Sequence, residues 1–130
     1  MFVTDTHPVA YYSGGKHSKL SRRALQLFED AQQAKVTIYI PTPALWELAD
    51  LINVGRVELP PRFDYWCRNM ETKTGFIIEP LTWADVNEAR YLPFADAMDC
   101  LITGTALRLD HPLITKDQAI IDSRLVDTIW

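Results

Sequence analysis

Short apolar runs alternate with helical patterns along the 130 residues of the chain. Apolar or β-branched runs that end in a polar residue or a proline are typical of buried parallel strands. Five segments have this character: residues 1–4, 36–40, 76–79, 113–115 and 125–129. Strands that alternate with helices predict an α/β fold, in which a mostly parallel five-stranded sheet is covered by helices on both faces.

The segments between these runs carry apolar residues at helical spacing. One helix is predicted to begin with Thr42 as its cap and Pro43 at its first position, and to end at Gly55. Further helices are predicted for residues 24–31, 63–70, 83–91 and 97–109. The Thr-His-Pro sequence of residues 6–8 is expected to form a turn, and residues 13–18 a flexible loop.

Acidic residues occur at positions that this fold brings together. Asp5 and Asp117 each follow a predicted strand, and ligands of open α/β sheets bind beyond the carboxyl ends of the strands. Asp96 and Asp99 lie three apart at the start of one helix, which places them on the same face. Glu47 lies in the first two turns of the helix that follows the second strand. The pattern therefore predicts an acidic pocket at one edge of the sheet.

Carboxylates that lie close together repel one another unless a proton or a cation neutralises them. Ligand sets made only of oxygen select hard ions, here Mg²⁺ or Mn²⁺. One such ion can activate a water for attack on a phosphate ester, and a second can stabilise the leaving oxygen. The hydroxyl of Thr115 could orient a water or a carboxylate in this pocket.

The charge distribution adds a basic patch to an acidic molecule. The net charge of −4 argues against a protein that coats nucleic acid by bulk attraction. Residues 6–28 nevertheless contain no acidic residue and carry four basic ones. These are Lys16, Lys19, Arg22 and Arg23. They could hold substrate phosphates beside the acidic pocket, while Tyr11, Tyr12 and Trp46 could stack unpaired bases.

Composition is typical of one globular domain, with 48% apolar and 23% charged residues. No apolar run approaches the roughly 20 residues that span a membrane, so no membrane partner is expected. The first residues lack the pattern of a signal peptide. Cys67 and Cys100 lie in apolar helical patterns without metal-ligand spacing, and we expect both to be reduced core residues. These features favour a cytoplasmic protein.

Each of these features also has a simpler explanation. An aspartate after a strand is commonly a turn or cap residue, Asp96 can be the N-cap of its helix, and Glu47 can be a solvated charge. The basic run can be a solvated loop, and the aromatic residues can belong to the core. Residue patterns alone support an α/β domain with an acidic pocket.

Four motifs occur in order along nearly the whole chain. They are Val-Thr-Asp-Thr-His-Pro at residues 3–8, Ile-Pro-Thr-Pro-Ala-Leu-Trp-Glu-Leu-Ala at 40–49, Asp-Ala-Met-Asp-Cys-Leu-Ile-Thr-Gly-Thr-Ala at 96–106, and Leu-Ile-Thr-Lys-Asp at 113–117. In this order and spacing they resemble the PIN-domain family, specifically its VapC-like toxin group. The Gly-Arg-Val-Glu-Leu-Pro connector at residues 55–60 resembles the same group.

The resemblance implies a three-layer α/β/α PIN domain over residues 1–130 that acts as a metal-dependent endoribonuclease. Water would attack an RNA phosphodiester and leave a 5′-phosphate. The implied site comprises the quartet Asp5, Glu47, Asp99 and Asp117, which would bind Mg²⁺ or Mn²⁺, with Asp96 as an auxiliary and Thr115 as a supporting polar residue. The family's toxins are inhibited by a small antitoxin encoded beside them and typically form homodimers.

Two positions depart from the family pattern: Ala97, where many relatives have proline, and Gly104, where alanine is usual. Neither departure removes an acid, and each is expected to alter helix geometry slightly, because glycine costs about 1 kcal/mol against alanine in a helix. Two other functions are consistent with the sequence. One is a PIN-like module that binds RNA or protein without cutting, and the other is a phosphohydrolase or DNA nuclease with the same metal site.

Overall fold

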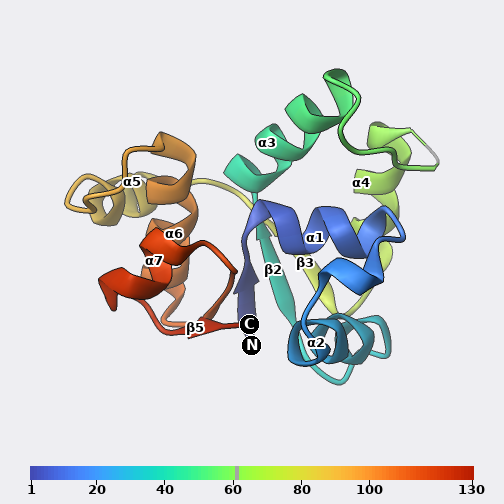
Figure 1. The fold of residues 1–130 in the computed structure, drawn as a ribbon, viewed down its shortest axis with the longest axis horizontal. Coiled ribbons are helices and arrows are strands. Elements are labelled where there is room, and N and C mark those ends of the chain that lie inside the picture. Colours follow the sequence, from blue (N-terminus) through green and yellow to red (C-terminus); the bar gives the residue numbers. More distant parts are fainter. Residues whose placement is uncertain (61) are drawn as a thin grey trace.

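A five-stranded parallel sheet forms the middle layer of the computed structural model, which describes residues 1–60 and 62–130 (Figure 1). The strands are β1 Phe2–Thr4, β2 Ile38–Pro41, β3 Phe76–Glu79, β4 Leu113–Ile114 and β5 Thr128–Ile129. Their order in the sheet is β3-β2-β1-β4-β5, and every neighbouring pair is parallel. All carboxyl ends therefore lie at one edge of the sheet, and the predicted α/β class with a five-stranded sheet is confirmed.

Helices cover both faces of this sheet. They are α1 Thr6–Ser13, the 3-10 helix η1 His17–Lys19, α2 Arg22–Gln32, α3 Thr42–Asn53, α4 Phe63–Thr72, α5 Trp83–Ala89, α6 Ala97–Leu109 and α7 Gln118–Ser123. In Figure 1, α1 to α4 lie on one side of the central strands and α5 to α7 on the other. No helix among the described residues is long and apolar enough to cross a membrane.

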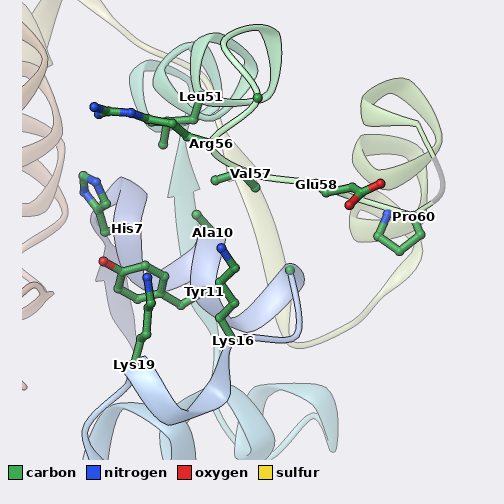
Figure 2. Close-up of a pocket in the computed structure, with 12 residues that line it drawn as sticks. His7, Ala10, Tyr11, Lys16, Lys19, Leu51, Arg56, Val57, Glu58 and Pro60 are labelled. Atoms are coloured by element: carbon green, nitrogen blue, oxygen red, sulfur yellow. The ribbon is translucent and has the colours of Figure 1, made fainter.

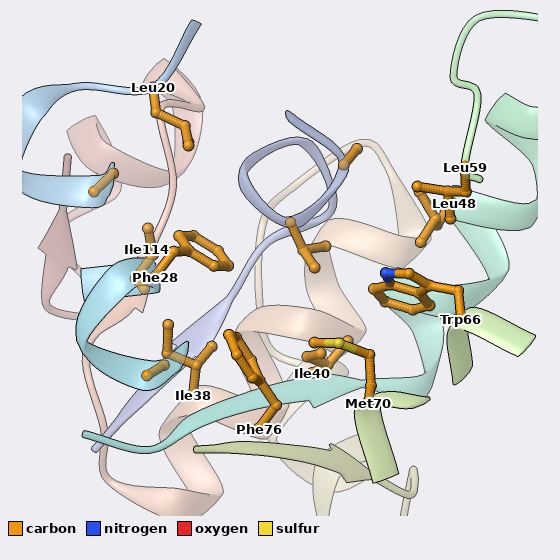
Figure 3. Close-up of a cluster of buried hydrophobic side chains, with 14 residues drawn as sticks. Leu20, Phe28, Ile38, Ile40, Leu48, Leu59, Trp66, Met70, Phe76 and Ile114 are labelled. Atoms are coloured by element: carbon orange, nitrogen blue, oxygen red, sulfur yellow. The ribbon is translucent and has the colours of Figure 1, made fainter. Parts of the chain in front are cut away.

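Alternation along the strands divides the core between the two faces. Ile38 and Ile40 of β2 pack with α1, α2 and α4, whereas Val3 of β1 packs with α6 and α7. On the first face, Phe28 is fully buried and its ring lies 6.3 Å from that of Phe76 (Figure 3). Complete burial of such side chains contributes about 1.5–3 kcal/mol each, so the two clusters hold the sheet edges and helix ends in fixed positions.

The turn predicted for residues 6–8 is wrong, because helix α1 begins directly after β1. Asp5 is the N-cap of this helix, and its Oδ1 accepts a hydrogen bond of 2.8 Å from the backbone N–H of Thr6. Pro8 falls in the first turn, where its missing N–H would have no partner within the helix. Pro8, which suggests a turn when only the sequence is considered, is therefore compatible with helix α1.

Three other boundaries differ from the prediction. Pro41, rather than Thr42, is the N-cap of α3, and the hydroxyl of Thr42 instead accepts a hydrogen bond of 3.1 Å from the N–H of Leu81. Helix α7, which the apolar pattern does not predict, follows Asp117. Strand β5 begins three residues later than predicted, because Arg124 leaves α7 in a left-handed conformation and the chain must return to the sheet.

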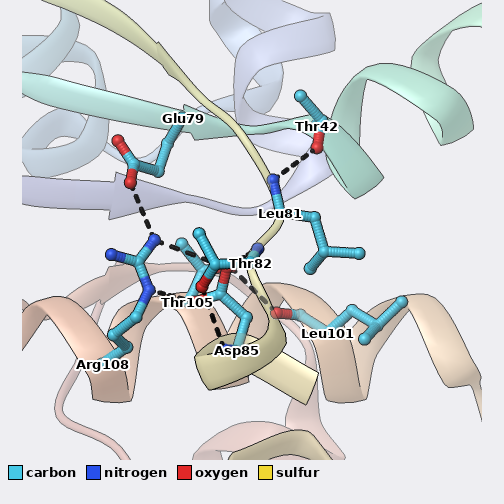
Figure 4. Close-up of polar contacts among 8 residues, drawn as sticks. All are labelled: Thr42, Glu79, Leu81, Thr82, Asp85, Leu101, Thr105 and Arg108. Atoms are coloured by element: carbon cyan, nitrogen blue, oxygen red, sulfur yellow. Dashed lines mark hydrogen bonds and ion pairs between the residues drawn. The ribbon is translucent and has the colours of Figure 1, made fainter.

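A partly buried ion-pair network joins β3, α5 and α6 (Figure 4). Asp85 of α5 is fully buried and forms a capping box with Thr82. Arg108 of α6 donates from its Nε to Asp85 and, over 2.7 Å, from a terminal nitrogen to Glu79 at the end of β3. Because each buried carboxylate has a cationic partner, the desolvation of these charges is compensated.

Gly104 explains how closely α5 and α6 approach. A Cβ at this position would lie 2.6 Å from the carbonyl oxygen of Asp85 and 3.2 Å from the Cβ of Ala89. The glycine that departs from the family pattern is therefore required by the helix contact, and its effect is larger than the slight change of helix geometry expected from the sequence.

We predict that Gly104→Ala lowers the free energy of unfolding by about 1–3 kcal/mol, because overpacking outweighs the gain in helix propensity. Urea denaturation measures this difference. Asn87→Ala, on the exposed surface of α5, is the matched control and should leave stability equal or slightly higher. A Gly104→Ala variant as stable as the wild type would contradict the steric argument.

Candidate metal centre at the carboxyl edge of the sheet

Asp5 occupies the point where β1 changes into α1. Its side chain is 6% exposed. Oδ1 accepts the hydrogen bond from the N–H of Thr6, and Oδ2 accepts a hydrogen bond of 2.7 Å from the hydroxyl of Thr115. Its own N–H donates to the carbonyl of Ile114 in the neighbouring strand β4, over 3.0 Å. One carboxylate oxygen is therefore fixed by the start of α1 and the other by the residue that follows β4.

Two more carboxylates reach the same point from helices. Glu47 lies in the second turn of α3, and its Oε1 accepts a hydrogen bond of 2.6 Å from the hydroxyl of Thr6. Asp99 lies in the first turn of α6. Carboxylate oxygens of Asp5, Glu47 and Asp99 all lie within 4.8 Å of one another. The structure thus brings together three of the four acids predicted to form the site.

The remaining acids lie at the rim of the same pocket, which has a volume of about 310 Å³. Its lining residues are Asp5, His7, Glu47, Asp96, Asp99, Lys116 and Asp117. Asp96 is the N-cap of α6, as its simpler explanation proposed, and its Oδ1 accepts a hydrogen bond of 2.7 Å from the N–H of Met98. Asp117 caps α7 in the same way, through a bond of 3.1 Å from the N–H of Ile120.

Thr115 connects the central acid to the rim. Its hydroxyl donates to Oδ2 of Asp5 and accepts a hydrogen bond of 3.0 Å from the N–H of Asp117. Thr6 has a comparable position between Asp5 and Glu47. No function for Thr6 is predicted from the sequence, although its place directly after Asp5, at the start of a helix, is the signal that could have identified it.

Burial and mutual repulsion raise the pKa values of the clustered acids. The pKa of Asp99 is raised to about 7, first by burial and then by the charges of the other four acids in the pocket. Burial also raises the pKa values of Asp5 and Glu47, although the hydrogen bonds from Thr115 and Thr6 oppose the shifts. Three such oxygens carry full negative charge together only at considerable cost, which a hard cation would remove. The donor set therefore fits a metal site.

The four basic residues predicted to bind substrate separate into two pairs. Lys16 and Lys19 line a second pocket of about 620 Å³, which shares His7 with the acidic pocket. Arg22 and Arg23 lie exposed at the start of α2 and are not among the lining residues of this pocket.

The three aromatic residues expected to stack bases also have different environments. The ring of Tyr12 is stacked between His17 and Phe28, at centroid distances of 5.0 and 4.9 Å, and belongs to the core. Tyr11 lies beside the basic pocket, and Trp46 is 66% exposed next to Glu47. Tyr11 and Trp46 therefore line pockets beside the acidic site, whereas the ring of Tyr12 packs against His17 and Phe28.

Solved structures share this architecture over nearly the full chain. A chain of a toxin–antitoxin complex from Klebsiella pneumoniae is 14% identical, with a TM-score of 0.65 and coverage of 100% of this chain and 97% of that one. FitAcB from Neisseria gonorrhoeae gives 15% identity, a TM-score of 0.67 and the same coverage. VapBC2 from Rickettsia felis, bound to a DNA fragment from its promoter, gives 15% identity, a TM-score of 0.69 and coverage of 99% and 98%.

The chain has the three-layer PIN-like fold. The resemblance noted in the sequence is thereby confirmed at the level of the fold, which identities of 14–15% establish without fixing an activity. Neither a protein-family model nor a curated protein sequence matches the chain significantly. The PIN-like fold accounts for the convergence of the acids, because its parallel strands and the helices after them end or begin at one edge.

We predict that Asp99→Asn stabilises the metal-free protein above pH 7 by about 1 kcal/mol or more, after allowance for partial exposure of the side chain. The pKa of Asp99 in the folded state, about 7, exceeds its ordinary value of 3.8. Folded wild type therefore binds more protons between these values and loses stability as the pH rises through 7. The variant has no such loss.

Urea denaturation in EDTA at pH 5, 6, 7 and 8 tests this prediction, since the advantage of the variant should grow with pH. Glu88→Gln, an exposed acid on α5, is the matched control and should show no trend. An advantage that stays constant from pH 5 to 8 would contradict the electrostatic argument.

Proposed function

We propose that the protein is a divalent-metal-dependent endoribonuclease whose PIN domain spans residues 1–130. The observation that supports this most is the convergence of Asp5, Glu47 and Asp99 within 4.8 Å, with the pKa of Asp99 raised to about 7. Such a cluster is destabilising without a cation, and hard cations are natural partners of phosphates. The proposed function therefore gives a chemical reason for an arrangement that weakens the protein.

In this proposal Asp5, Glu47 and Asp99 hold Mg²⁺ or Mn²⁺, and Asp117 completes the quartet from the rim. A bound ion of this kind lowers the pKa of water and screens the charge of a phosphodiester, so that hydrolysis can leave a 5′-phosphate. The hydroxyls of Thr6 and Thr115 keep Glu47 and Asp5 oriented toward the pocket by donating hydrogen bonds to them.

Asp96 and Lys116 complete the pocket without joining the proposed quartet. Asp96 holds the start of α6, and with it the backbone of Asp99, by capping the first turn. Lys116 places a positive charge at the rim, where it can attract the phosphate of an RNA strand. The substrate is thus drawn to a site whose own carboxylates would otherwise repel it.

We further propose that the enzyme is the toxin of a type II pair and is bound by a small antitoxin encoded beside it. The names of the structural neighbours support this, since one is a toxin–antitoxin complex and two others, VapBC2 and FitAB, are bound to DNA fragments. A homodimer in the cytoplasm is part of the proposal. Exposed apolar residues on and beside α5 are consistent with such an interface: Leu81, Trp83, Val86 and Tyr91.

Cleavage of a folded RNA pool by antitoxin-free protein tests the proposal directly. We expect cutting with Mg²⁺ or Mn²⁺ and none with EDTA. Asp5→Asn and Asp99→Asn should each lower the rate by at least about 100-fold, because loss of a ligand exceeds the 10–100-fold effect of an outer-shell residue. Asp117→Asn should cause a loss of about 10-fold, since Asp117 lies at the rim and caps α7.

Asp122→Asn, which changes an exposed acid on the same helix α7 outside the pocket, is the matched control and should cut at the wild-type rate. Products with 5′-phosphate ends would match the proposed direction of hydrolysis. A folded protein that binds RNA but never cuts it would favour the non-cleaving module. Preferential cleavage of DNA in a competition assay would favour the DNA nuclease.

A further inference from the structure

We propose that the pocket between α1 and the end of α3 holds an unpaired nucleotide of the RNA strand, next to the phosphodiester that is cut. This proposal rests on the proposed function in taking RNA as the ligand. The pocket has a volume of about 620 Å³ and contacts α1, the loop after it, η1, the end of α3 and the connector that follows (Figure 2). Sites for single small ligands typically have volumes of about 300–1,000 Å³.

The charge of this pocket is opposite to that of the whole molecule. Lys16, Lys19 and Arg56 line it, and Glu58 is the one acid among its described lining residues, in a chain with a net charge of −4. Figure 2 shows Glu58 beside Pro60, on the opposite side of the pocket from Lys19. The part of the pocket nearest the acidic site is therefore positively charged, as a site for phosphate requires.

A continuous path of side chains connects the basic pocket to the acidic one. His7 lines both pockets. Tyr11 lines the basic pocket, and its hydroxyl accepts a hydrogen bond of 2.9 Å from Nζ of Lys116, which lines the acidic pocket. The amino groups of Lys19 and Lys116 lie 5.4 and 4.8 Å from the centre of the Tyr11 ring.

A polyanion fits this path better than a single phosphate does. A strand with one phosphate at Asp5, Glu47 and Asp99 could continue past Lys116 toward Lys19 and Lys16. Because the cations continue beyond the acidic cluster, they add affinity for a chain of phosphates. The same arrangement would add little for an isolated phosphate ester.

The remaining walls of the basic pocket favour a base or a sugar. Ala10, Leu51, Val57 and Pro60 supply apolar surface, and the ring of Tyr11 supplies an aromatic edge or face. A base enters such a pocket only when it is free of its pairing partner, as in a loop, a bulge or a strand end. The pocket therefore fits an unpaired nucleotide beside the cleaved bond better than a base held within a continuous duplex.

Binding of a fluorescent 12-nucleotide RNA in EDTA, at 50–200 mM salt, tests the proposal without cleavage. The test variant is Lys16→Ala/Lys19→Ala/Arg56→Ala. The charge-matched control is Lys35→Ala/Arg68→Ala/Arg90→Ala, which removes three exposed cations outside the pocket. Denaturation in urea verifies that each variant is folded, and a third variant, Lys16→Arg/Lys19→Arg/Arg56→Lys, retains the charge.

Each lost phosphate contact lowers the slope of log affinity against log salt by about 0.7 for a single strand, so the pocket variant should lose about 2 from this slope. Its affinity should fall about 10-fold or more, while the control loses less than about 2-fold and the charge-retaining variant stays near wild type. Equal losses in both triple variants would indicate diffuse attraction and overturn the proposal. Wild-type RNA binding that survives the pocket substitutions would leave the pocket to a protein partner and overturn it as well.

The same RNA annealed to its complement tests the need for an unpaired base. We expect the single strand to bind at least about 10-fold more tightly, with this preference reduced in the pocket variant. Equal affinities would contradict insertion of a nucleotide. Cleavage with Mg²⁺ or Mn²⁺ is measured separately. Binding that depends on the pocket, without cleavage, would contradict the proposed ribonuclease activity alone. Cleavage without binding that depends on the pocket would contradict the nucleotide pocket alone.

Discussion

Repulsion between carboxylates is the constraint around which the carboxyl edge of the sheet is organised. Asp5, Glu47 and Asp99 come from a strand end and two helices, and their oxygens converge within 4.8 Å. Hydrogen bonds from Thr6 and Thr115 hold two of them in place but do not neutralise them. Burial and this repulsion raise the pKa values of the three acids, and a cation bound at the edge would stabilise the folded state.

A second group of acids in the same molecule is neutralised by an arginine. Asp85 and Glu79 are both paired with Arg108, which joins α5 and β3 to α6. Among the described residues, no salt bridge involves the three clustered acids. One acidic group thus has its own internal cation, whereas the other has the donor set for a cation from solution. Because Arg108 and Asp99 share helix α6, the structural network also helps to fix the position of the site.

The spacing of apolar residues predicted the architecture well. The apolar runs of β2 and β3 are typical of buried strands, and the apolar stripe of α3 is typical of a helix. The convergence of Asp5, Glu47 and Asp99 could be predicted too, since parallel strands place their ends at one edge. Residues that serve two functions at once could not be predicted from the sequence. Asp5 both faces the pocket and caps α1, so the Thr-His-Pro sequence that reads as a turn is a helix start. The placement of Lys16 and Arg56 in one pocket depends on the length and direction of α3, which local patterns do not contain.

The central claim is that the acidic cluster is a metal site, and a crystal soaked in Mn²⁺ tests it most directly through anomalous scattering. We expect an anomalous peak from an ion bound directly by carboxylate oxygens of Asp5, Glu47 and Asp99, at roughly 2.0–2.2 Å, the range of hard divalent ions smaller than Ca²⁺. The peak should be absent in crystals of Asp99→Asn. Mn²⁺ found only at surface acids outside this pocket, or a peak that persists unchanged in the variant, would contradict the account.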